Sequence, residues 1–133
     1  MRLSVVRETV NFIGIDHMVT LRFSNGASTA FESTFTVGEP SGAISQVAPD
    51  GDKSSLVPAL RLHTQTVIEA RIDESSLELT FSSGVVLRAD PDAQYESWHY
   101  TGPERPPVRV IALGGGDLFT SIPDDEDDRA EQR

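Results

Sequence analysis

Apolar and polar residues alternate along two similar stretches of the chain. Residues 19–26 (Val-Thr-Leu-Arg-Phe-Ser-Asn-Gly) and residues 77–84 (Leu-Glu-Leu-Thr-Phe-Ser-Ser-Gly) each alternate up to a Phe and then reach a Gly. The two Phe residues lie 58 positions apart, as do the two Gly residues. Alternation with period two places every second side chain on one face of a β-strand, and Asn-Gly is the strongest short signal for a hairpin turn. The pattern therefore predicts two related β-hairpins.

The same rule predicts the remaining elements. Alternation resumes at residues 27–37 and 85–89, which complete the two hairpins, and further strands are expected at residues 12–15, 66–72, 95–100, 108–113 and 118–122. Residues 3–10 form either a first strand or a frayed arm. Residues 54–60 begin with two serines and hold Pro58 early, which favours one short helical turn. We expect the core to include Leu21, Phe23, Phe31, Phe35, Leu79 and Phe81.

Eight or nine short strands with at most one short helix predict an all-β fold. We expect an antiparallel sandwich or an open barrel-like roll, built from two related hairpin halves at about residues 10–40 and 60–100 that pack about a pseudo-twofold axis. Residues 38–55, which are rich in Gly and Pro, are expected to form a long loop with a turn at residues 49–52, either mobile or functional. The length of 133 residues fits one domain, residues 1–123, followed by an acidic tail, residues 124–133, that we expect to be disordered.

The composition excludes several classes of protein. The chain has no cysteine, which excludes a disulfide scaffold, zinc–thiolate sites and thiol catalysis. No apolar run approaches the roughly 20 residues of a membrane span, and the N-terminal apolar run is too short for a secretion signal. We therefore expect a soluble, cytoplasmic protein that does not bind membranes.

The charge is strongly negative and is shared between the body and the tail. The net charge is −10, of which residues 124–133 carry −4 and residues 1–123 carry −6. An acidic body repels nucleic-acid backbones, so we expect no nucleic-acid binding. It attracts a basic protein partner and speeds the encounter at low salt. The alternative is that the charge serves solubility alone.

No constellation for catalysis is apparent. The chain has no Gly-x-Ser-x-Gly motif, and Gly114–Gly116 is followed by Asp117, which favours a hairpin turn over a phosphate loop. His17, His63 and His99 do not stand at a spacing that places two on one metal, and no carboxylate-rich cluster surrounds them in the sequence. We expect no catalytic residue, no metal and no cofactor, and hence no enzyme.

The segment from Tyr95 to Tyr100 is the most distinctive, since it holds the one Trp and both Tyr residues. In a strand, Trp98 and Tyr100 share one face with Glu96, while Tyr95 and His99 share the other. Exposed aromatic residues beside carboxylates are typical of protein-binding hot spots, although the favoured interpretation of Trp98 is that it anchors the core. The candidate partner surface comprises Asp90, Asp92, Tyr95, Glu96, Trp98, His99 and Tyr100.

Three motifs carry a resemblance to a known group of proteins. Tyr95-Glu96-x-Trp98 is followed by an apolar strand and Gly115-Gly116-x-Leu118, and Leu79-x-Phe81-x-x-Gly84 precedes them. Over roughly residues 60–120 this resembles the C-terminal signature of a family of small, mostly uncharacterised bacterial proteins, common in actinobacteria. Such proteins are similar in size and charge to immunity proteins that neutralise toxins of interbacterial competition. The resemblance supports the fold and assigns no catalytic residue.

Three functional hypotheses follow. The first is a non-enzymatic protein-binding module, of the immunity or antitoxin type, that inhibits a basic partner protein. The second is a homo-oligomeric assembly component, such as a homodimer, that pairs through free edge strands. The third is a β-roll that binds a small molecule, or an enzyme, with candidates Asp90, Asp92, Glu96 and His99.

Overall fold

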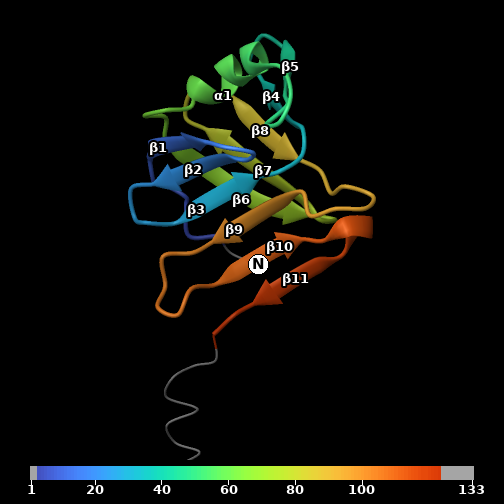
Figure 1. Cartoon of the computed structure of the whole chain (residues 1–133). Coiled ribbons are helices and arrows are strands. Elements are labelled where there is room, and N and C mark those ends of the chain that lie inside the picture. The colour runs from blue at the N-terminus through green and yellow to red at the C-terminus, as the bar shows by residue number, and fades with distance from the viewer. Residues whose placement is uncertain (1–2, 124–133) are drawn as a thin grey trace, which may run out of the picture.

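Two antiparallel β-sheets pack face to face in the computed structural model, which describes residues 3–123. In Figure 1 the six-stranded sheet faces the viewer and the five-stranded sheet runs behind it. The prediction of an all-β sandwich with one short helix is confirmed. The strands are β1 (Val10–Ile15), β2 (Val19–Phe23), β3 (Ser28–Phe31), β4 (Phe35–Gly38), β5 (Ile44–Val47), β6 (Val67–Asp73), β7 (Ser76–Phe81), β8 (Val86–Ala89), β9 (Trp98–Thr101), β10 (Arg109–Ala112) and β11 (Leu118–Ser121).

The two sheets share one strand order, in which each strand of the first half corresponds to the strand numbered five higher in the second half. One sheet has the order β1-β2-β3-β9-β10-β11 and the other has the order β5-β4-β8-β7-β6. Strands β1 to β5 therefore correspond in turn to β6 to β10, and β11 is an addition. Each half forms three strands of one sheet and then crosses over to add two strands to the sheet of the other half. This exchange interlocks the two related halves.

The two hairpin turns match in their hydrogen bonds and backbone angles. Phe23 N donates to Ala27 O over 2.8 Å, and Phe81 N donates to Val85 O over 2.9 Å. The glycine in each turn has a positive φ, 93° at Gly26 and 91° at its counterpart 58 residues later. Glycine adopts this left-handed conformation without steric penalty, so the sequence repeat encodes a repeated turn.

The inward-facing residues of both sheets form one core. The six residues predicted to point inward are all buried, and the largest fully buried side chains also include Trp98 and Tyr100. The N-terminal segment is neither a strand nor a frayed arm, because Leu3 and Val5 are buried and the chain turns at residues 4–7. A short helix α1 (Val57–Leu60) follows a 3-10 turn η1 (Lys53–Leu56). In the described residues no helix is long and apolar enough to cross a membrane.

Three local predictions differ from the structure. The expected strand at residues 27–37 is two strands, β3 and β4, which lie in different sheets. The expected loop at residues 38–55 contains β5, which pairs with β4. The expected strand at residues 95–100 begins only at Trp98, because the preceding residues form a crossover loop. The predicted acidic tail, residues 124–133, lies outside the described residues.

Candidate functional site

The two crossovers between the sheets meet at one end of the sandwich. Residues 32–34 connect β3 to β4, and residues 90–97 connect β8 to β9. Strands β3 and β9 pair directly, with Phe31 opposite Trp98. Glu32 N then donates to Ser97 O over 2.9 Å, which fixes the start of one crossover against the end of the other. The exchange of strands between the halves thus brings polar residues from distant parts of the sequence together.

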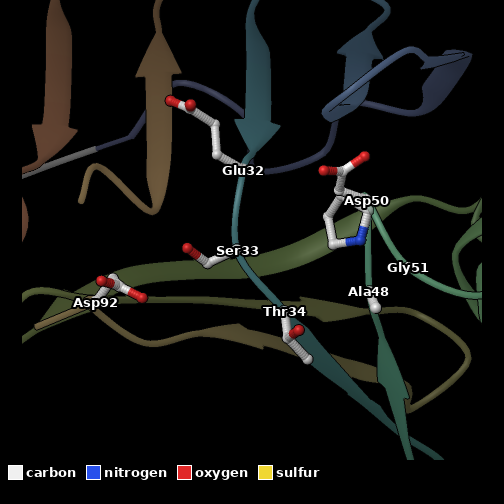
Figure 2. A pocket seen from close by; sticks show the side chains of 8 residues that line it. Glu32, Ser33, Thr34, Ala48, Asp50, Gly51 and Asp92 are labelled. Atoms are coloured by element: carbon white, nitrogen blue, oxygen red, sulfur yellow. The ribbon is translucent and has the colours of Figure 1, made fainter. Parts of the chain in front are cut away.

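An open pocket of about 390 Å³ lies beside these crossovers. Figure 2 shows Asp92 on one side of the segment from Glu32 to Thr34, and Asp50 on the other side. Three of the lining side chains are carboxylates, and no Lys or Arg lines this pocket in the described structure. The full lining comprises Glu32, Ser33, Thr34, Ala48, Pro49, Asp50, Gly51 and Asp92.

A tight turn after β5 positions Asp50. Gly51 N donates to Ala48 O over 3.1 Å, with Pro49 at the second position, where its fixed φ suits a β-turn. A Cβ at Gly51 would stand only 2.8 Å from Ala48 Cβ, so this turn has no room for a larger residue without adjustment. Asp50 is exposed in this turn, and Figure 2 shows it on the side of the segment from Glu32 to Thr34 opposite Asp92. The predicted turn at residues 49–52 thus lies one residue earlier and forms one wall of the pocket.

Asp92 is held by the backbone of its own loop. Its Oδ1 accepts hydrogen bonds from Gln94 N (2.8 Å) and Tyr95 N (3.0 Å), and these bonds lower the pKa of the carboxyl group. The Asp92 carbonyl oxygen accepts a third bond from Gly115 N over 2.9 Å. Hydrogen bonds to the charged form favour ionisation, so Asp92 keeps its negative charge in the pocket wall at neutral pH.

A histidine lies between two glutamates next to the pocket. His99 stands opposite Ala30 in the β3–β9 pair, and Glu32 lies two residues further along on the same face. The distance from His99 Nε2 to Glu32 Oε2 is 2.7 Å, and the distance to Glu96 Oε1 is 3.2 Å. The expectation that no carboxylates surround the histidines is therefore wrong for His99, because strand pairing brings in Glu32 from 67 positions away.

Two of the predicted partner-surface residues are core residues instead. Trp98 is fully buried, and its Nε1 donates to Ser75 O over 3.0 Å. Tyr100 is 1% exposed, and its hydroxyl oxygen accepts a bond from Ser4 N over 2.9 Å. Both side chains lie on the inner face of β9, so neither can contact a partner. The alternative interpretation of Trp98 as a core anchor is confirmed.

The other predicted site residues lie on the surface but do not converge on one point. Tyr95 is 70% exposed and lies in the same loop as Asp92. Asp90 accepts bonds from Arg88 Nε (2.9 Å) and Ser76 Oγ (2.7 Å), so its charge is paired away from the pocket. Of the four candidates for a small-molecule site, only Asp92 lines the described pocket.

Comparison with known proteins identifies a family. The chain belongs to DUF6188. This is a family of unknown function, and its sequence profile matches residues 1–120. The match agrees with the predicted resemblance to an uncharacterised family and extends it to the N-terminus. No curated protein and no solved structure matches the chain.

Sequence reasoning missed two of the site residues in this DUF6188 protein. Glu32 occupies the place 58 residues before Asp90, and each is the first residue after its hairpin. Aligning the two sequence repeats could therefore have identified Glu32 and Asp90 as equivalent residues at the start of the two crossovers. Asp50 carries a turn signal only, and nothing in its local sequence indicates that its turn lines the same pocket as the other two carboxylates.

Proposed function

We propose that this protein is a non-enzymatic binding module that takes a basic side chain of a partner protein into the acidic pocket. The observation that carries the proposal is the pocket lined by Glu32, Asp50 and Asp92 without a cationic side chain in the described lining. Carboxylates in a concave surface focus a negative potential, which attracts an Arg or Lys and speeds association. An Arg guanidinium can form paired hydrogen bonds with such carboxylates.

The surroundings of the pocket support a protein rather than a free cation as the ligand. Tyr95 is exposed beside the Asp92 loop, and tyrosines next to charged groups are frequent anchors of protein interfaces. The net charge of −6 on residues 1–123 favours approach of a basic surface. Inhibition of a basic toxin, as an immunity or antitoxin protein, is the biological form that we propose for this binding.

Capture from extracts of the native organism at low salt tests the proposal. The test variant is Asp50→Asn with Asp92→Asn, because an asparagine side-chain oxygen can still accept the two backbone bonds that shape the loop. The matched control is Glu69→Gln with Asp73→Asn on edge strand β6, which removes the same charge elsewhere. Charge-assisted hydrogen bonds contribute about 1.5–3 kcal/mol each, so the pocket variant should bind roughly a hundredfold more weakly.

The expected result is a basic protein retained by the wild type and by the control, and lost from the pocket variant and at high salt. Calorimetry with the purified partner then gives the affinities. If that partner arrests growth when expressed alone, co-expression with this protein should restore growth. Equal retention by the pocket variant, or retention of no basic protein, would contradict the proposal.

Self-association is a second candidate, favoured by β11, which is an edge strand within the described residues. All four residues of β11 are exposed, and Phe119 is 48% exposed on that edge. Unpaired edge strands with apolar side chains can pair with a second copy. Analytical ultracentrifugation should then give a dimer that Phe119→Lys dissociates, whereas a monomer near 14.5 kDa would exclude it.

A further inference from the structure

The group formed by His99, Glu32 and Glu96 has the composition of a metal site. One imidazole nitrogen and one oxygen from each carboxylate all lie within 4.8 Å of one another. Glu32 comes from the crossover after β3, Glu96 from the crossover before β9 and His99 from β9, so the fold rather than a local sequence motif assembles them. Three convergent protein ligands are the number that open zinc sites use, with water completing the coordination.

The state of the histidine nitrogen provides a second, independent observation. His99 Nε2 is inaccessible to solvent and has no hydrogen bond of acceptable geometry. It lacks such a bond even though both carboxylate oxygens lie within 3.2 Å of that nitrogen. Both carboxylate oxygens therefore lie close to this nitrogen. A metal ion bound between the three atoms would satisfy this buried nitrogen and both oxygens together.

We propose that His99, Glu32 and Glu96 bind a divalent first-row transition metal ion, with Zn²⁺ as the best match. Imidazole is a ligand of intermediate softness that suits Zn²⁺, Co²⁺ and Ni²⁺, whereas Mg²⁺ and Ca²⁺ prefer oxygen ligands alone. The two glutamates supply charge that balances the ion. This proposal goes beyond partner binding. Glu32 also lines the acidic pocket, but Glu96 and His99 do not.

Titration calorimetry of the full chain with Zn²⁺ tests the site directly. The protein carries no histidine tag and is first treated with a chelator. The test variants are His99→Ala and Glu96→Gln, and the matched control is His17→Ala, which removes an exposed histidine 3.6 Å from the Asp16 carboxylate. Loss of an outer-shell partner of a metal ligand typically weakens binding by about 10–100-fold, so loss of a ligand should weaken it by at least about tenfold.

The expected result is saturable binding of one Zn²⁺ per chain, weakened by both test variants and unchanged in the control. Co²⁺ should give a visible absorption band that Zn²⁺ displaces, and Mg²⁺ should not compete. If the His99→Ala variant does not fold, two other measurements test the same ligand set. Zn²⁺ binding should be weaker in Glu96→Gln, and adding Zn²⁺ to the wild type should shift the ring resonances of His99. Absence of saturable binding, or binding that survives both test substitutions, would overturn the proposal. Because the partner experiment alters only Asp50 and Asp92, the two proposals fail separately.

Discussion

The buried hydroxyl of Tyr100 gives the sharpest prediction about stability. Burial raises the pKa of the Tyr100 hydroxyl group above its ordinary value near 10, and the hydrogen bond from Ser4 N opposes part of that rise. The fold therefore favours the neutral form. The resulting stabilisation is fully present below the pKa of the unfolded chain and is lost as the pH rises through the higher pKa of the folded state. Stability should decline above about pH 10.

The substitution Tyr100→Phe separates the two contributions of this hydroxyl. At neutral pH it leaves the half-buried Ser4 N–H without its partner 2.9 Å away, which should lower the free energy of unfolding by about 1 kcal/mol. At alkaline pH the variant has no hydroxyl to ionise, so its stability should decline less steeply than that of the wild type. The two curves should converge as the pH rises.

Urea unfolding, followed by Trp98 fluorescence from about pH 7 to about pH 11, measures both effects. The matched control is Tyr95→Phe, because Tyr95 is 70% exposed and its hydroxyl has no bond within the described residues. The control should match the wild type in stability and in pH dependence. A Tyr100→Phe curve parallel to the wild type, or a flattened curve in the control, would refute this reasoning.

Two further predictions concern the repeated turns and the core. Replacing Gly26 or Gly84 by Ala forces a left-handed backbone on a residue with a Cβ and should destabilise by about 1–2 kcal/mol in thermal unfolding. The Gly84 variant should lose more, because its Cβ would stand 2.9 Å from Pro40 Cγ while nothing lies near that of Gly26; equal losses would contradict this. Trp98 should show blue-shifted emission that iodide does not quench, and quenching like that of free tryptophan would place it at the surface.

The strands and turns that local sequence patterns encode are the part of the fold that could be predicted. The strand at residues 19–23 and both Gly turns follow directly from the sequence, because period-two burial and a positive φ are local properties. The crossover after Phe31 could not be predicted from the alternation. Phe31 and Phe35 lie in different sheets, but both side chains face the same core, so the apolar–polar alternation continues across the crossover. Strand β5 was missed because only Val47 in it is buried.

The candidate site was less predictable than the fold. Asp92 was chosen because it precedes the aromatic segment and His99 because it lies within it, but no local pattern joins them to Glu32 or Asp50. Those residues meet through the β3–β9 pairing and the turn after β5, which are tertiary contacts. The error at Tyr100 has a simple cause. The strand begins at Trp98, so the inward face could be assigned only once its pairing with Phe31 was known.

Binding of a cationic side chain in the acidic pocket is the central proposal, and NMR with a defined probe tests it most directly. A short arginine peptide is titrated into the ¹⁵N-labelled full chain and into the Asp50→Asn, Asp92→Asn variant. We predict that the largest shifts fall on the backbone amides of residues 32–34, 48, 50, 51 and 92, and that they vanish in the variant. Shifts confined to residues 124–133, or equally large shifts in the variant, would contradict the proposal.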